Sequence, residues 1–514
     1  MSGSSTELTK RKAFAFALDG DGVATASSSS TNSGLQSPHS GGHHSRQLLA
    51  ELDVRPSCAA DAPRRYVRTG ERLALASASA SPAADTHSVR ARLAGCVSLR
   101  GITRELKEMF LPAGYPDSVS EDYLAFQCWD TLQAVCSYLR GVLATQSVLQ
   151  SVGVGNDKAT PLAAALQWVL RDGSGMIGGL TFAYFVGPKF DVNVKRWRLF
   201  ADVINDVGLT LDMLAPFFPS LVTEVLCVSS VCKTMCGVAA GATRSSLMTH
   251  FAKRDNMADC AAKEGSQETA VKLFGLVFGM YFANAVNSSP AAIWVAFLTL
   301  TLVHVFANYN AVSGLCIPTV NQQRGLILIQ RFLRAGSTKD SDVVEHLTQF
   351  SIRSVNQSEP IYYDSKLPIS RIIMGSQVCD ANLSVHDWDF LLQLYSDEHY
   401  LLSIDNDRVH VLFRTDMKPK DELRAFYQAV VALEALETQA ASAVSASPSP
   451  SPTSKAKAAA AASGGQHRAL LESSYDKMSA DFSFFHQQLQ TSGWRTHMFL
   501  LNTSTWRIRL SEDV

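Results

Sequence analysis

The longest segment without a charged side chain constrains this protein most. Residues 273–323 contain no Asp, Glu, Lys or Arg, a run of 51 residues. Within the run, LFGLVFGMYFANAV is followed by NSSP and then by AAIWVAFLTLTLVHVFANY. About 20 mostly apolar residues in a helix cross the hydrocarbon core of a bilayer, so segments 269–287 and 291–310 are each long enough. The run therefore predicts an apolar helical hairpin over residues 269–310, with its turn at 287–290.

Such a hairpin can lie in a membrane or in the interior of a large soluble domain. Helices in soluble cores usually keep a charge on one face, which favours the membrane. Basic residues flank the run at both outer ends, including Lys272 before it and Arg324 after it, whereas its turn carries no charge. By the positive-inside rule both outer ends then lie on the cytosol-like side. We therefore expect a membrane-embedded core.

The overall charge excludes one class of function. Lys and Arg number 46 and Asp and Glu number 47, so the formal net charge is −1 and no basic excess marks a surface for nucleic acid. The ten cysteines include no CxxC pair, which argues against a structural zinc site. The sequence also lacks GxSxG, HExxH and GxxxxGK[ST] motifs. We therefore expect a non-catalytic protein with no metal and no cofactor.

Composition divides the chain into three parts. Residues 1–62 are rich in Ser, Gly, Thr and Ala, which predicts a disordered tail. Residues 63–336 show helical periodicity and predict a mainly α core. Residues 337–514 contain a strand–turn–strand pattern, HYLLSIDNDRVHVLFR, followed by amphipathic helices and a terminal strand. They predict a small α+β domain, in which the Ser-Pro and Ala tract at 438–467 is a disordered insertion.

A second apolar segment, residues 207–232, contains Pro216 and Pro219. Proline removes a helical hydrogen bond and clashes with the preceding turn. A break at this point makes the segment a helical hairpin or a re-entrant element, and the basic loops on either side of it then face the same side.

Several glycines have the spacing of close helix contacts. The sequence Gly173-x-Gly175-x-x-Gly178 fits a dinucleotide fingerprint literally, but ALQWVLRD before it reads as helix and not as the strand that this fingerprint needs. Small residues allow helix backbones to approach closely. The predicted helix-packing positions are Gly175, Gly178, Gly237, Gly241, Gly275 and Gly279.

A polar helical face accompanies these apolar segments. Arg198, Asp202 and Asp206 follow one another at i, i+4 spacing. Such a face next to apolar helices can hold a cation or relay protons, or it can be an ion-pair ladder with Arg196 and Arg198, which we favour. His304 lies in the final apolar arm, where an interhelical hydrogen bond is expected and not a metal.

The central part of the chain resembles a known family. The blocks FLPAGYPDSVSEDYLAFQCWDTLQAVCSYLRG, KRWRLFADVINDVG and VCKTMCGVAAGATRSSLMTHFAKRDNMADCAAKEGS are similar to the root UV-B-sensitive (RUS) family. The resemblance implies a helical, membrane-associated protein without an established reaction. It also implies links, in plants, to UV-B response, development, auxin transport and vitamin B6 homeostasis, with a plastid location for some members. The matching positions include Gly114, Tyr115, Pro116, Trp129, Asp130, Asp172, Gly173, Asp202, Asp206, Lys233, Gly241, Arg244, Asn256, Asp259, Lys263 and Ser266.

Two functional hypotheses follow. The first is a membrane-embedded adaptor or transport-associated protein that contacts lipid, and that forms oligomers with itself or with other RUS-family chains. The second is a soluble or peripheral helical protein that binds a phosphate-bearing molecule, such as a vitamin B6 form, through Lys233, Arg244 and Lys263. The candidate polar or ligand site comprises Asp202, Asp206, Lys233, Arg244, Asn256, Asp259, Lys263 and Ser266.

Overall fold

A computed structural model describes residues 48–51, 64–69, 72–75, 99–153, 161–335, 349–362, 368–446 and 456–510. The first three of these segments form an antiparallel sheet of β1 (Leu48–Glu51), β2 (Arg64–Thr69) and β3 (Arg72–Leu75), in that order. β1 lies within the tail that we expected to be disordered, and it pairs with β2. The remainder of that expected tail lies outside the described residues.

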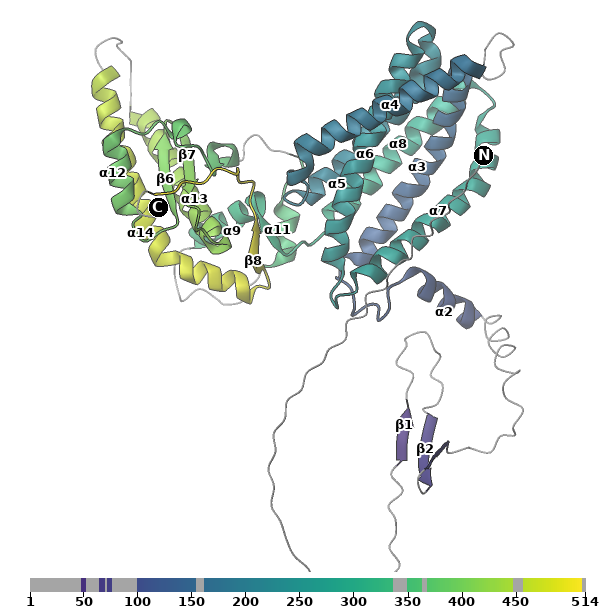
Figure 1. The fold of residues 1–514 in the computed structure, drawn as a ribbon, viewed down its shortest axis with the longest axis horizontal. Coiled ribbons are helices and arrows are strands. Elements are labelled where there is room, and N and C mark those ends of the chain that lie inside the picture. The colour runs from purple at the N-terminus through teal and green to yellow at the C-terminus, as the bar shows by residue number, and fades with distance from the viewer. Residues whose placement is uncertain are drawn as a thin grey trace, which may run out of the picture. The chain divides into compact units, whose positions relative to one another are not determined.

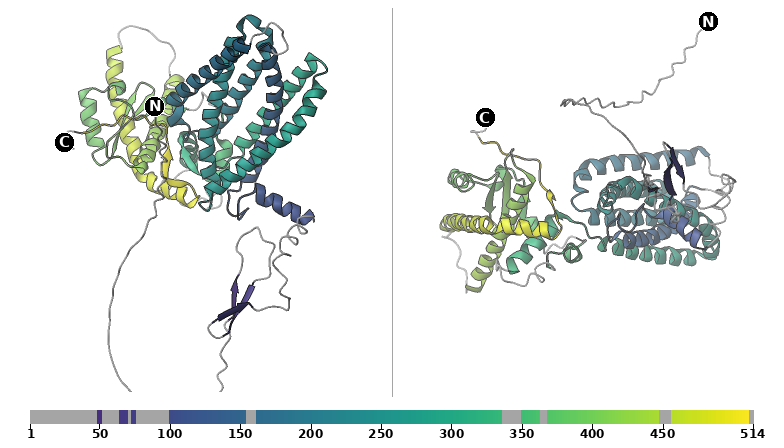
Figure 2. Two further views of the ribbon diagram at one scale, coloured as in Figure 1. Left: turned by 45° about the vertical axis from the view of Figure 1, so that its right-hand side comes forward. Right: turned by 90° about the horizontal axis from the view of Figure 1, so that it is seen from below.

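The central part is a helical bundle (Figure 1). Short α2 (Leu99–Phe110) precedes α3 (Tyr123–Ser151) and α4 (Pro161–Val186). The other bundle helices are α5 (Val194–Leu214), α6 (Val222–Phe251), α7 (Met257–Val286) and α8 (Pro290–Ser313). Helix α6 packs between α4 and α5, and α3 packs against both α7 and α8. The left panel of Figure 2 shows these long helices running side by side.

The predicted apolar hairpin is present as α7 and α8. Ser289 begins α8 as its N-cap, since its side-chain oxygen accepts a hydrogen bond from the Ala292 amide at 3.2 Å, and Pro290 occupies the first turn. The two arms contact α3 far more than they contact each other. Among the described residues, three helical segments are long and apolar enough to cross a membrane: Pro219–Phe251, Met257–Val286 and Pro290–Ser313. The last two are the arms of the predicted hairpin.

The predicted break in the second apolar segment is also present. Helix α5 ends at Leu214, and the 3-10 turns Ala215–Phe217 and Pro219–Leu221 lead into α6. The two helices then pack against each other as a hairpin. At its open end the Ser246 hydroxyl donates a hydrogen bond to Asp191 at 2.6 Å, so the loop before α5 and the last turns of α6 lie at the same end of the bundle.

Several bundle helices expose apolar side chains, and α8 also buries polar ones. On α8, Leu298, Leu302 and Phe306 are 52%, 73% and 60% exposed, whereas His304 and Asn308 on the same helix are 0% and 3% exposed. Large apolar side chains are also exposed along α4 and α7, for example Leu180 and Tyr281. On α8, exposed apolar side chains therefore point outward, while the polar side chains of His304 and Asn308 point inward.

The C-terminal part is an α+β domain, as expected. A mixed sheet has the order β5 (Ile372–Met374), β7 (Arg408–Phe413) and β6 (Tyr400–Asp405), where β6 and β7 form the predicted hairpin and β5 runs parallel to β7. Helix α13 (Pro419–Ala446) packs on this sheet and against α14 (Ala456–Thr491), and α12 (Val385–Leu394) contacts β6. The terminal strand β8 (Arg495–Leu500) pairs in parallel with β4 (Thr319–Asn321).

Two boundaries differ from those expected. Helix α13 extends to residue 446 and α14 begins at 456, so most of the expected disordered insertion 438–467 is helical. The reason is its alanine content, because alanine has the highest intrinsic helix propensity. In addition, α9 (Gln322–Ala335) packs into the C-terminal core through Leu326 and Ile329, although the expected boundary at 336 places it with the bundle. The short helix α11 (Ile352–Ser358) follows it and contributes Val355 to the same core.

Candidate functional site

A buried ion cluster lies at the centre of the bundle. Arg140 of α3 is fully buried, and its Nη1 lies 2.6 Å from Oδ1 of Asp206 on α5. The other Asp206 oxygen lies 3.2 Å from Nδ1 of His304 on α8. Arg140 also donates a hydrogen bond to the Thr301 hydroxyl at 3.2 Å. Three helices that are distant in sequence therefore meet at one charged group, and the predicted interhelical hydrogen bond of His304 is present.

A second carboxylate extends this cluster by one helical turn. Asp202 accepts hydrogen bonds from Gln133 Nε2 at 2.8 Å and from Asn308 Nδ2, and Arg198 Nε lies 3.9 Å from it. The Gln133 amide nitrogen also lies 3.0 Å from His304 Nε2, which joins the two carboxylates through one side chain. We call Arg140, Asp202, Asp206, His304, Gln133 and Asn308 the central network.

Each carboxylate of the central network already has a guanidinium group nearby, without an added cation. Asp202 and Asp206 face the guanidinium groups of Arg198 and Arg140, respectively. The expected intrahelical ladder therefore accounts for only part of the structure, because most partners of the two carboxylates come from α3 and α8. Among the described residues, Arg140 Nε and Nη2 are buried and donate no hydrogen bond, so the network keeps unused donors.

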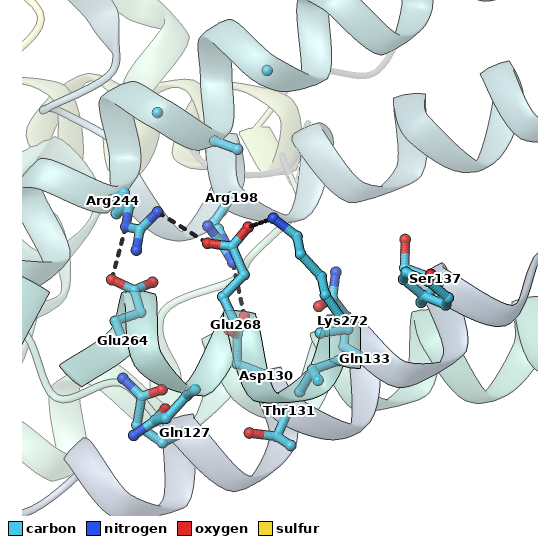
Figure 3. A pocket seen from close by; sticks show the side chains of 17 residues that line it. Gln127, Asp130, Thr131, Gln133, Ser137, Arg198, Arg244, Glu264, Glu268 and Lys272 are labelled. Atoms are coloured by element: carbon cyan, nitrogen blue, oxygen red, sulfur yellow. Dashed lines mark hydrogen bonds and ion pairs between the residues drawn. The ribbon is translucent and has the colours of Figure 1, made fainter. Parts of the chain in front are cut away.

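An open cavity of about 510 Å³ lies beside the central network, between α3, α5, α6 and α7. Figure 3 shows its polar walls. Arg198 Nη2 lies 2.7 Å from Asp130 Oδ1, and Arg244 Nε lies 2.9 Å from Glu264 Oε2. Glu268 lies between Arg244, at 3.5 Å, and Lys272, at 2.7 Å. Gln133 lines the cavity and belongs to the central network, so it connects the two.

A separate buried pair joins α5 to α6. Asp212 accepts hydrogen bonds from Lys233 Nζ and from the Ser229 hydroxyl. Lys233 and Arg244 are 11 residues apart on α6, which corresponds to about 16 Å along a helix. Lys263 instead donates to the Glu108 carbonyl at 2.5 Å. The three cations of the predicted anion site are therefore held apart, each by a different partner.

The remaining predicted site residues lie in or just before the first turns of α7 and contact other groups. Asp259 accepts a hydrogen bond from the Ala113 amide at 2.7 Å, and Asn256 accepts one from the Arg254 amide at 3.3 Å. The Ser266 hydroxyl donates to the Ala262 carbonyl of its own helix at 3.0 Å. None of these three residues lines the cavity. Their described contacts position the loop before α3 and the start of α7.

The glycines divide into two groups. A Cβ atom at Gly175 would lie 2.4 Å from the Ser230 hydroxyl, at Gly178 2.7 Å from Val231, and at Gly275 2.5 Å from Tyr138; at Gly279 the nearest atom would be 3.5 Å away. At Gly237 and Gly241, no atom lies within 4 Å of such a Cβ, and both residues line the cavity. The packing expectation thus differs from the structure at these two positions, where the missing side chains leave the cavity open.

Sequence reasoning missed several charged or polar members of the site, including Gln127, Gln133, Arg140, Glu264, Glu268 and Lys272. Arg140 and Asp130 are the only charged residues in α3, which is a signal that marks Arg140, whereas Gln133 is one of several uncharged polar residues there. Glu264 and Lys272 carry no such signal, because they lie among other charged residues in the N-terminal part of α7, as residues of a solvent-exposed helix face do. Of the positions that the resemblance singled out, Asp130, Gly241 and Arg244 line the cavity, and Asp202 and Asp206 lie in the central network.

Comparisons with known proteins agree with this architecture. Residues 98–336 match the family model "Vitamin B6 photo-protection and homoeostasis domain", and residues 348–510 match "Root UVB sensitive protein, C-terminal". No solved structure matches the chain significantly.

Individual relatives match half of the chain or more. The chain is 36% identical to protein root UVB sensitive 3 of Arabidopsis thaliana over 79% of its own length and 86% of that protein. It is 42% identical to RUS family member 1 of Dictyostelium discoideum over 50% of each chain. It is 28% identical to protein root UVB sensitive 2, chloroplastic, of Arabidopsis thaliana over 79% of its length and 86% of that protein. The two family models and the length of these matches place the chain in the root UVB sensitive (RUS) family.

Proposed function

We propose that this chain is a membrane-embedded, non-catalytic protein that binds a small polar solute inside its helical bundle and takes part in the transport of that solute. The observation that carries the proposal is the inverted polarity of α8. Leu302 is 73% exposed and His304, two residues later, is fully buried. In this proposal the Leu302 side chain contacts lipid, and the His304 side chain contacts polar groups inside the bundle.

An aqueous environment would make this arrangement expensive. Moving a Leu or Phe side chain out of water is worth about 1.5–3 kcal/mol, and α4, α7 and α8 each leave several such side chains exposed. Besides lipid, a neighbouring chain in an oligomer could remove these apolar side chains from water. The exposed apolar face of α4, including Leu166, Ile177 and Leu180, therefore suits lipid or another RUS-family chain.

The polar interior supports a role with a solute. Ionisable residues inside membrane helices are costly and commonly mark a path for substrates or ions. Here the central network adjoins a cavity whose volume lies within the range of small-molecule sites. Because the matching family model is named for vitamin B6 homoeostasis, vitamin B6 forms are the first solutes to test. One relative is named as chloroplastic, so a plastid membrane is a location to test if the source is photosynthetic.

Alkaline carbonate extraction tests the membrane part of the proposal. Membranes that contain the tagged full-length protein are washed with carbonate at high pH and separated by centrifugation. The proposal predicts that the protein stays in the pellet with an integral membrane marker, while a peripheral marker is released. Recovery of the protein in the supernatant would contradict it.

Uptake by proteoliposomes tests the transport part. The purified protein is reconstituted, and the accumulation of radiolabelled pyridoxine, pyridoxamine and pyridoxal phosphate is compared with protein-free vesicles. We expect at least one form to accumulate faster with the protein, and His304→Leu to reduce that rate. Exposed Arg353→Leu is the control. Rates equal to those of protein-free vesicles for all three forms would contradict a direct part in their transport.

A further inference from the structure

The cavity beside the central network has space that its own side chains leave unfilled. Gly237 and Gly241 form part of its α6 wall, and a Cβ at either position would meet no atom within 4 Å. The volume of about 510 Å³ accommodates a molecule of one ring with its substituents. The glycines therefore provide room for a ligand and not for a neighbouring helix.

The formal charges of the cavity walls are balanced. Asp130, Glu264 and Glu268 supply three carboxylates, and Arg198, Arg244 and Lys272 supply three cations. Because each cation contacts a carboxylate of the same wall, a solute that carries a single charge must compete with an existing partner. A solute with both an anionic and a cationic group can instead contact both members of a separated pair.

One of these pairs is suited to such an exchange. Glu268 lies 3.5 Å from Arg244, which is a longer contact than the other ion pairs of the wall. The Glu268 and Lys272 side chains are 46% and 63% exposed. Glu268 can turn toward solvent, while Arg244 remains bonded to Glu264 at 2.9 Å. In Figure 3 Glu268 lies between Arg244 and Lys272, so its movement leaves two cations facing one space.

A buried donor in the opposite wall is also unused. Gln127 is 4% exposed, lines the cavity, and its Nε2 donates no hydrogen bond to any described residue. A buried amide without a partner costs about 1–3 kcal/mol. An acceptor atom on a bound solute would remove that cost.

We infer that this cavity is the binding site for a small amphoteric solute, whose anionic group takes the place of the Glu268 carboxylate between Arg244 and Lys272 and whose cationic group contacts the displaced Glu268. The inference rests on the proposed function and adds the charge class of the solute. It also gives the site a connection to the central network, because Gln133 lines the cavity and contacts both Asp202 and His304.

Three probes separate the charge classes. Pyridoxamine 5′-phosphate carries a phosphate and an ammonium group, pyridoxamine lacks the phosphate, and inorganic phosphate lacks the amine. Binding of each probe to the full-length protein in detergent is measured by isothermal titration calorimetry. We expect pyridoxamine 5′-phosphate to bind at least about tenfold more tightly than either of the other probes, which corresponds to about 1.4 kcal/mol. Equal affinity for inorganic phosphate, or no binding of any probe, would overturn the inference.

Matched variants locate the site. Gly241→Leu fills the cavity and is expected to weaken binding of the amphoteric probe at least about tenfold, whereas Gly141→Leu, also at a position with no atom within 4 Å but outside the cavity, leaves it unchanged. Lys272→Gln provides a second variant at an exposed position and is expected to weaken this probe more than pyridoxamine. Unchanged binding by both Gly241→Leu and Lys272→Gln would place the site elsewhere. These binding tests do not depend on the carbonate-extraction and uptake results. A wrong charge class for the solute can therefore be distinguished from a wrong membrane or transport assignment.

Discussion

Replacing Arg140 by leucine tests whether the central network stabilises the bundle. Arg140 Nη1 lies 2.6 Å from Asp206 Oδ1, and both side chains are at least nine-tenths buried. At an effective dielectric constant of about 20, two unit charges at this separation attract by about 6 kcal/mol before the cost of desolvation is subtracted. Removal of one member leaves the other as an uncompensated buried charge, which typically costs about 3–5 kcal/mol. We therefore expect Arg140→Leu and Asp206→Leu each to lower the free energy of unfolding by about 3–5 kcal/mol.

The double variant gives the sharper result. Replacing both members of a buried pair by apolar residues removes the uncompensated charge. The loss in Arg140→Leu/Asp206→Leu should therefore be smaller than the sum of the two single losses by about 2–3 kcal/mol. The assay is unfolding of the full-length protein in mixed micelles by titration with sodium dodecyl sulfate, followed by helical circular dichroism.

An exposed ion pair provides the control. The Arg353 and Glu121 side chains are 66% and 82% exposed and 3.5 Å apart. Pairs of this kind contribute about 0–1 kcal/mol, so Arg353→Leu should change little. Additive losses in the Arg140 and Asp206 variants would refute the argument, as would single losses no larger than that of the control.

Two further predictions concern the ends and the packing of the bundle. Burial raises the pKa of Asp122, but the hydrogen bond and charge interaction with His250, together with hydrogen bonds from the Cys316 amide and the Ser120 hydroxyl, lower the pKa to about 2. The stabilisation is therefore present above the ordinary pKa and is lost as pH falls from about 4 to about 2. Asp122→Asn should lower the free energy of unfolding by about 2 kcal/mol at pH 7 and by about half as much at pH 3. An equal loss at both pH values would count against this pairing. Gly178→Ala places a Cβ 2.7 Å from Val231 and should lower thermal stability, whereas Gly141→Ala, with no atom within 4 Å, should not. The measurement is the midpoint temperature of thermal unfolding of each variant in detergent. Equal midpoint temperatures for the two variants would argue against close packing at Gly178.

The sequence predicted the helices of the bundle better than the faces that they bury. Leu124, Cys128 and Leu132 follow helical spacing, yet all three are exposed, while Gln133 and Arg140 on the same helix are buried. Apolar periodicity reports that a helix has two faces. It does not report which face is buried, and on this helix Gln133 and Arg140 share the buried face with apolar residues such as Leu139.

The site could be predicted only where its residues share one helix. Asp202 and Asp206 are visible from their spacing, but Arg140 and His304 meet Asp206 through tertiary packing across 66 and 98 residues of chain. Local spacing carries no information about such pairs. In the C-terminal domain, by contrast, the hairpin of β6 and β7 turns at Asn406, which has φ of 54°, a conformation that Asn tolerates well. Its Asp-Asn-Asp sequence therefore predicted the turn correctly.

The most direct test of the membrane assignment is the environment of the outward face of α8. A spin-labelled amino acid is incorporated at position 302, where the native leucine is 73% exposed, and at position 121, whose side chain is 82% exposed in the loop before α3. Collision rates with oxygen and with a water-soluble nickel chelate are then measured by electron paramagnetic resonance on the protein in lipid nanodiscs. A lipid-facing position 302 gives frequent collisions with oxygen and few with the chelate, and position 121 gives the opposite. Frequent collisions of position 302 with the chelate would contradict the placement of this face in lipid.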